Sequence, residues 1–179
     1  MKTHKPITLT AVILLSVIQP ALAQWQTKFS GLSTAQRGLY EMSAPDIRNC
    51  YATTYDQTDF YHFLNEIVLT HDGGQTWSSV TIDSLENNFM MDIAGSSSRV
   101  VHVIGWNSVA GGGNVFRSMD GGATWKRQFT GSRWGLSGVF FTDAKTGWAV
   151  GAYGTILHTT TGGEPPAALL PEPAGTTAK

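Results

Sequence analysis

The apolar residues of this chain occur in short runs that are separated by polar turn residues. Between residues 39 and 159, runs rich in β-branched and aromatic residues alternate with clusters of Gly, Asn, Ser and Asp. This alternation is typical of strands joined by tight turns. No ten-residue stretch of the chain beyond the N-terminal segment keeps the 3.6-residue apolar period of a helix. The pattern therefore predicts an all-β protein.

The strand-like runs recur in three copies of about 45 residues each. Copy by copy, they are "GLYEMS", "NCYATTY" and "EIVLT"; "NFMMDIA", "RVVHVIG" and "NVFRS"; "LSGVFFT", "TGWAVGA" and "TILHT". In the first two copies a fourth run follows, "TWSSVTI" and "TWKRQFT". Four short antiparallel strands per repeat are the signature of a β-propeller blade. We therefore predict a propeller-like array of about three four-stranded antiparallel blades, at about residues 39–82, 88–131 and 136–163.

The third copy has no fourth run of its own. The chain continues from "TTTGGEPP" with prolines at 165, 166, 171 and 173, which cannot sustain a strand ladder. Residues 24–30, "QWQTKFS", resemble the missing strand and could close the third blade, with Trp25 in the place of Trp77 and Trp125. Closed propellers need at least four blades. The sequence thus predicts an incomplete ring, an open arc that assembles with copies of itself, or a truncated member of a longer family.

A turn with two glycines precedes each fourth run. It reads "THDGGQTW" and "SMDGGATW", while the third copy, "HTTTGGEP", keeps the glycines and replaces the acid by Thr161. An aspartate in such a turn accepts hydrogen bonds from following backbone N–H groups, and the glycines supply positive φ angles. A catalytic role would need a second carboxylate or a histidine at a repeated position, which the pattern lacks. We assign a structural role to Thr70, Asp72, Gly73, Gly74, Thr76, Trp77, Ser118, Asp120, Gly121, Gly122, Thr124, Trp125, Gly162 and Gly163.

These turns resemble the Asp-box of the BNR (bacterial neuraminidase) repeat. The neighbouring "VFFTDAKTGWAVGAYGTILHTTTGG" is similar to the repeat of photosystem II stability/assembly factor-like proteins. The matching positions are Asp143, Gly147, Trp148, Val150, Gly151, Gly154, Ile156, Thr159, Gly162 and Gly163. The similarity covers about residues 39–163 and implies a β-propeller with the boxes at its periphery. Asp-boxes occur in hydrolases, receptors and assembly factors alike, so the resemblance implies no activity and no role in photosystems.

A glycosidase is the main catalytic alternative, because sialidases and xyloglucan-degrading enzymes carry Asp-boxes. None of the six arginines lies in the Arg-Ile-Pro context expected of a sialidase. Glycoside hydrolysis needs two carboxylates across a cleft, and Asp46, Glu66, Asp92 and Asp143 each read as turn or solvent-facing acids. A fragment of an Asp-box glycoside hydrolase remains an alternative, as does a truncated propeller without independent function.

The remaining residue types favour neither a cofactor nor a metal. The histidines at 62, 71, 102 and 158 show no metal-binding spacing. We expect His71 to be an exposed turn residue, and His102 and His158 to point to solvent or to pair locally. The single cysteine, Cys50, cannot form an internal disulfide and reads as a small buried residue.

The N-terminal segment predicts export, and the C-terminal segment predicts a tail outside the repeat domain. Residues 1–23 combine two lysines, an apolar core too short to span a bilayer comfortably and the small residues of "ALA", as in a signal peptide cleaved near Ala23. Residues 24–163 would form the repeat domain, and residues 164–179 a Pro-rich disordered tail. The chain after Ala23 has ten basic and thirteen acidic residues, so we expect neither nucleic-acid binding nor membrane attachment after cleavage.

The surface features that are left suit binding. Trp106 lies beside a glycine-rich loop, and Arg133 precedes Trp134 between two blades. Such residues are favoured in interfaces. We therefore predict a secreted or periplasmic, non-enzymatic propeller module that binds a protein or glycan partner and could form a homo-oligomer.

Overall fold

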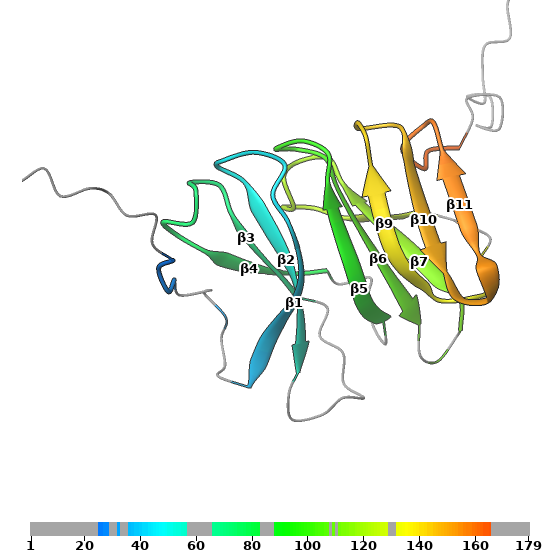
Figure 1. The fold of residues 1–179 in the computed structure, drawn as a ribbon, viewed down its shortest axis with the longest axis horizontal. Coiled ribbons are helices and arrows are strands. Elements are labelled where there is room, and N and C mark those ends of the chain that lie inside the picture. The colour runs from blue at the N-terminus through cyan, green and yellow to red at the C-terminus, as the bar shows by residue number, and fades with distance from the viewer. Residues whose placement is uncertain are drawn as a thin grey trace, which may run out of the picture.

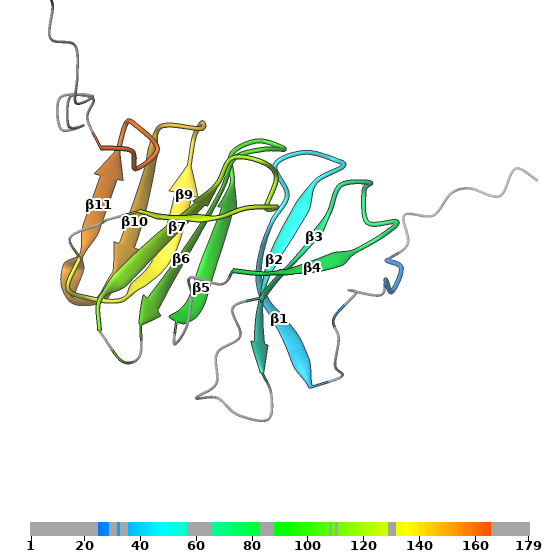
Figure 2. The same ribbon diagram turned by 180° about the vertical axis from the view of Figure 1, so that it is seen from behind.

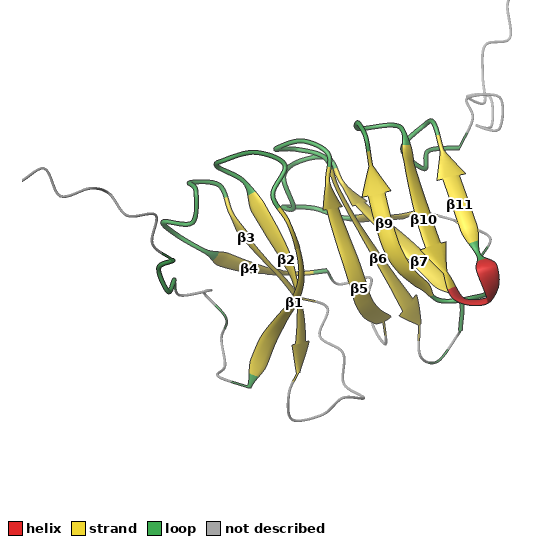
Figure 3. Cartoon of the chain, viewed as in Figure 1, coloured by secondary structure: helices red, strands yellow, loops and turns green. Residues whose placement is uncertain are grey.

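The computed structural model describes residues 25–28, 32, 36–56, 66–82, 88–107, 109, 111–128 and 132–165. These residues form three antiparallel sheets and a single short 3₁₀ turn, Ala152–Gly154, so the predicted all-β class is confirmed (Figure 3). The predicted signal peptide and most of the predicted tail lie outside the described residues. Within the described part of the chain, no helix is long and apolar enough to cross a membrane.

The strands follow the repeat in the sequence. The first sheet contains β1 (Arg37–Ser43), β2 (Cys50–Asp56), β3 (Glu66–Thr70) and β4 (Ser78–Thr81). The second contains β5 (Asn88–Gly95), β6 (Val101–Asn107), β7 (Gly113–Ser118) and β8 (Lys126–Gln128). The third contains β9 (Leu136–Phe141), β10 (Gly147–Gly151) and β11 (Ile156–Thr159).

Each sheet is a simple meander in which consecutive strands pair. The three sheets lie side by side in chain order, and their first strands contact one another in the series β1, β5, β9 (Figure 1). The arrangement is that of three successive propeller blades, with the first strand of each blade toward the centre of an open arc.

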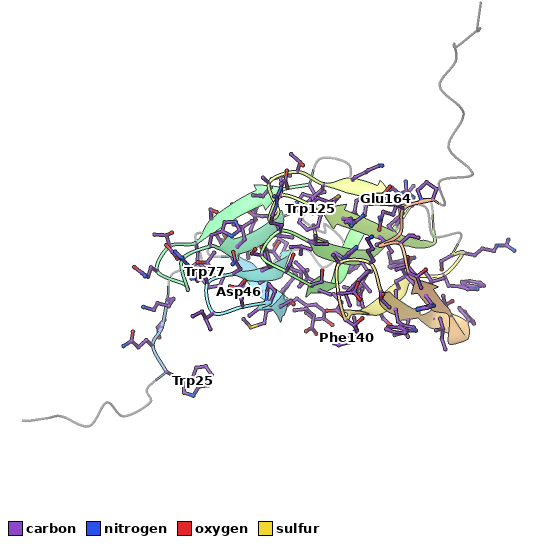
Figure 4. All side chains as sticks on the ribbon, turned by 90° about the horizontal axis from the view of Figure 1, so that it is seen from above. Trp25, Asp46, Trp77, Trp125, Phe140 and Glu164 are labelled. Carbon is purple, nitrogen blue, oxygen red and sulfur yellow. The ribbon has the colours of Figure 1, made fainter. Side chains whose placement is uncertain are left out.

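The third blade has three strands among the described residues. Residues 25–28 form no strand and Trp25 is fully exposed, standing apart from the blades (Figure 4). Residues 25–28 lie at the β4 end of the arc and β11 at the other end, in both the front and the rear view (Figures 1 and 2). Residues 25–28 therefore do not close the third blade of their own chain in this structure, while the rest of the expected closing strand lies outside the described residues.

Two hydrophobic cores hold the blades together. The core between the first and second blades contains Tyr51, Ile67, Leu69, Ile82, Met90, Ile93, Val101, Val103 and Phe116, with Val80 and Trp125 packed against it. The core between the second and third blades is smaller and contains Ile104, Val115, Leu136 and Ala149, with Val139 and Leu157 packed against it. Since burial of apolar area is the main stabilising term, the second interface is the weaker one.

Candidate functional site

The first glycine turn is a clamp built around Asp72. One oxygen of its carboxylate accepts hydrogen bonds from the backbone N–H groups of Gln75 and Thr76, both at 2.9 Å. The other accepts the hydroxyl of Thr76 at 2.6 Å. The backbone N–H of Gly74 donates to the hydroxyl of Thr70 at 3.0 Å, which closes the turn from its other side.

The second turn repeats this geometry. Asp120 accepts from the backbone N–H of Thr124 and from the hydroxyl of Ser118, each at 2.8 Å. Trp125 donates its indole N–H to the carbonyl of Gly122 at 2.9 Å, which fixes the ring at the start of β8. In the third turn, Thr161 replaces the acid and donates its hydroxyl to the carbonyl of Glu164 at 2.6 Å.

The glycines have positive φ angles in all three turns: Gly73 74°, Gly74 81°, Gly121 75°, Gly122 93°, Gly162 69° and Gly163 81°. The first glycine of each pair donates its N–H to a carbonyl in the turn between the first and second strands of the same blade, on Arg48, Arg99 and Lys145, at 2.8, 2.9 and 2.7 Å. Each glycine turn is therefore fastened to a second repeated turn.

Sequence reasoning did not single out this second turn as a repeat. Asp46 accepts the backbone N–H groups of Arg48 and Asn49, and Asp143 accepts those of Lys145 and Thr146. Ser97 does the same in the second blade for Arg99 and Val100. A signal was present in the "Asp-x-Arg" and "Asp-x-Lys" spacing, but serine in the middle copy obscured it.

The electrostatics of the glycine turns argue against acid–base chemistry. The hydroxyl and backbone N–H of Thr76 hold the pKa of Asp72 well below its ordinary value. The corresponding groups of Thr124 lower the pKa of Asp120. A general acid needs a carboxyl that is protonated near its working pH, and both groups are instead held as carboxylates by donors from their own turns.

The acids considered for glycoside hydrolysis do not form a pair across a cleft. Glu66 is buried and forms an ion pair with Arg37, so the expected turn or solvent-facing position is wrong for this residue. Asp92 accepts the backbone N–H of Val139 at 2.7 Å and thus joins the second blade to the third. Asp46 and Asp143 are turn acceptors, as described above. The described residues contain no group of three or more His, Cys, Asp or Glu side chains that could hold a metal ion.

His102 lies in the interior, which corrects the expectation of a solvent-facing or locally paired side chain. Its ring is fully buried and stacks on Phe141, with centroids 3.6 Å apart and planes at 5°. Burial, followed by the charge of Arg117, lowers its pKa to about 4. His71 is exposed, and its ring contacts the side chain of Asn49 at 2.6 Å. Cys50 is half-buried rather than fully buried.

The structure brings together the three residues proposed for binding. Trp106, Arg133 and Trp134 line one cavity of about 370 Å³ with Gly111, Gly112, Gly135, Ala152 and Tyr153. The ring of Trp134 lies against that of Tyr153, with centroids 4.2 Å apart. The exposed fractions of Trp106, Trp134 and Tyr153 are 40%, 47% and 82%. We call Trp106, Arg133, Trp134 and Tyr153 the aromatic surface.

Backbone contacts position the aromatic surface at the junction of the second and third blades. The backbone N–H of Ala152 donates to the carbonyl of Gly135 at 3.0 Å, which ties the β10–β11 turn to the segment preceding β9. A Cβ atom on Gly135 would lie 3.1 Å from the side chain of Trp106, so glycine permits this close approach. Tyr153 has a left-handed backbone, with φ 55° and ψ 35°. Sequence reasoning missed Tyr153, because its role depends on this turn.

No family model and no curated protein matches the chain. Solved structures do. One described as YCF48 bound to D1 peptide is 15% identical, with a TM-score of 0.55 over 74% of this chain and 44% of its own. YCF48 from Cyanidioschyzon merolae is 22% identical, with a TM-score of 0.58 over 75% of this chain and 40% of its own.

The fold is that of a β-propeller. The resemblance to the photosystem II stability/assembly factor-like repeat proteins is confirmed at the level of the fold. The chain spans less than half the length of either matched structure. The likeness therefore supports the assignment of the three sheets as consecutive blades.

A second, larger cavity of about 550 Å³ lies at the outer end of the third blade. It lies between the second and third blades. Val115 and Gln128 of the second blade form one wall, and Ala149 and Leu157 of the third blade form the other. The lining is mainly apolar and contains none of the acids considered for catalysis. This cavity and the aromatic surface share no lining residue.

Proposed function

We propose that the chain is an exported, non-enzymatic β-propeller module that binds a protein partner through the aromatic surface. The observation that carries the proposal is the convergence of three partly exposed aromatic rings and the Arg133 side chain around one cavity. Tryptophan, tyrosine and arginine dominate the binding energy of protein interfaces, because they combine large apolar area with a polar or charged group. The Asp-boxes stabilise the blades in this proposal and do not contact the partner.

The backbone of Tyr153 supports a binding role. It is the only non-glycine residue with a positive φ angle in the part of the chain that the structure describes. A bulky residue in this region costs on the order of 1 kcal/mol, and such strain tends to occur at functional sites. The side chain is 82% exposed, so its burial does not offset the cost within this chain.

The comparison favours a protein partner over a glycan. One of the two matched propellers is described as bound to a peptide. A positively charged guanidinium beside the aromatic rings also suits backbone carbonyls or acidic side chains of a protein segment. Export rests on the signal-peptide pattern of residues 1–23.

The proposal is tested by screening the purified protein against a displayed peptide library and a glycan array in parallel. We expect saturable binding to peptides, and a loss of about 30-fold in affinity for Trp134→Ala, as for a central interface tryptophan. Trp25→Ala is the matched control, because it removes an equally large exposed ring that does not line this cavity. Binding that survives Trp134→Ala, binding to glycans alone, or release of a chromophore from aryl glycosides would refute the proposal.

A further inference from the structure

The outer edge of the third blade is unpaired among the described residues. In the first two blades the third strand is covered by a fourth, since β3 pairs with β4 and β7 pairs with β8. β11 pairs with β10 alone. A free edge presents backbone N–H and C=O groups that can accept another extended strand.

The cavity of about 550 Å³ lies beside this edge, where a fourth strand would pack. It is lined by β11 itself, through Ile156, Leu157 and Thr159, and by Val115 and Gln128 of the second blade. In the second blade, Gln128 is the last residue of β8 and is buried, donating its amide to the carbonyl of Gly162 at 2.6 Å. The space that an added strand would enter is therefore already bounded by the complete second blade on one side and by the three strands of the third blade on the other.

The repeat shows which side chain this space lacks. Trp125 lies three residues after Gly122 and packs against the core between the first two blades. The equivalent position of the third copy, three residues after Gly163, is a proline, and proline cannot donate to a ladder. The smaller core between the second and third blades contains no tryptophan. A strand that begins with tryptophan would fill this position.

One segment of the chain has the required pattern. Residues 25–30 read "WQTKFS", and residues 125–130, which include β8, read "WKRQFT". In both segments, phenylalanine follows the tryptophan by four positions and a hydroxyl residue follows it by five. Trp25 is fully exposed, and residues 25–28 pair with no strand. Trp25 lies at the opposite end of the arc from Glu164, away from the β11 edge of its own chain (Figure 4).

We propose that the segment starting at Trp25 of one copy adds to the β11 edge of a second copy as the missing fourth strand. The added strand runs antiparallel to β11, and its backbone completes the ladder of the third blade. The indole of Trp25 enters the cavity beside Leu157 and Val115, as Trp125 packs between the first two blades. This contact shares no lining residue with the aromatic surface, so it is independent of the proposed partner site.

The test is the mass of the purified protein by light scattering across a dilution series. We expect assemblies of two or more chains, with the midpoint of dissociation shifted to at least tenfold higher concentration by Trp25→Ala. Ile156→Lys tests the acceptor side, because this residue is 71% exposed and a charge on an edge strand opposes strand addition. It should also release monomers. Trp134→Ala is the control and should leave the mass unchanged while weakening partner binding about 30-fold.

A peptide of residues 24–30 provides a second measurement. Added to the Trp25→Ala protein, it should bind saturably, and the same peptide carrying the Trp25→Ala change should bind at least tenfold more weakly. A monomer throughout the dilution series, a Trp25→Ala protein with unchanged mass, or equal binding of the two peptides would overturn the proposal. None of these outcomes tests partner binding by the aromatic surface. Strand addition at β11 can therefore be refuted without refuting the proposed function.

Discussion

Each Asp-box acid stabilises its turn by accepting several hydrogen bonds at once. Asp120 accepts hydrogen bonds from the backbone of Thr124 and from the hydroxyls of Thr124 and Ser118. Removing an acceptor leaves its donors without their partner. Asp120→Ala should therefore lower the free energy of unfolding by about 1–2 kcal/mol in urea titrations. Asp120→Asn keeps one acceptor oxygen and should cost less. Equal effects of the two variants would contradict the clamp.

His102 makes stability depend on pH. Its pKa is about 4 in the folded chain against an ordinary value of 6.5. The unfolded chain therefore binds this proton first as the pH falls, and the folded state loses stability between pH 6.5 and about 4, with no effect above that range. The full loss is on the order of 3 kcal/mol. His102→Phe should flatten this part of the profile in urea titrations at each pH. The exposed His158→Gln is the control and should not.

The turn acids should act in a different pH range. The pKa values of Asp46, Asp72, Asp120 and Asp143 all lie below the ordinary 3.8. Their stabilising effect is therefore present above that value and is lost as the pH falls further. A decline that starts near pH 6.5 is thus a signature of His102 alone among these groups. Its persistence in His102→Phe would show that another group causes it.

At the level of strands and turns, the features that depend only on neighbouring residues could be predicted from the sequence. Alternating apolar runs and glycine pairs are local signals, so the order of the strands and the glycine turns could be predicted. The burial of His102 and Glu66 could not, because it depends on which blade covers each strand. Trp106, Arg133 and Trp134 were identified as single exposed residues. Their meeting with Tyr153 follows from a contact between Ala152 and Gly135, which no local pattern encodes.

We expect the backbone conformation of Tyr153, in the β10–β11 turn, to lower the stability of the fold while its side chain contributes to partner binding. Asparagine adopts the left-handed conformation more readily than tyrosine. Tyr153→Asn should therefore keep or raise the free energy of unfolding, by up to about 1 kcal/mol, while weakening partner binding. Tyr153→Phe retains the ring and should bind normally. Thermal unfolding together with peptide titration would measure both effects. A Tyr153→Asn protein that binds as well as the unaltered chain would remove Tyr153 from the aromatic surface.

For the whole molecule, the open arc leaves the blades unequally supported. The first two blades share the larger core, whereas the third contributes only Leu136 and Ala149 as buried members of the smaller one. The outward-facing side of the third blade also exposes Phe140, Trp148 and Ile156. In a closed ring each blade would have two neighbours, so the last described blade is the one that opens most easily.

Hydrogen exchange should show that the third blade opens more easily than the first. Local opening requires less free energy where less apolar surface is buried and where backbone hydrogen bonds lie at an edge. Amides of β10 and β11 should therefore exchange faster than those of β2 and β3 when the protein is dilute. At concentrations where chains assemble, or with the peptide of residues 24–30 bound to the Trp25→Ala protein, β11 should become protected while β2 and β3 change little. Equal exchange in all blades would mean that the smaller core is not the weaker one. Uniform protection on assembly would place the contact between chains away from the β11 edge.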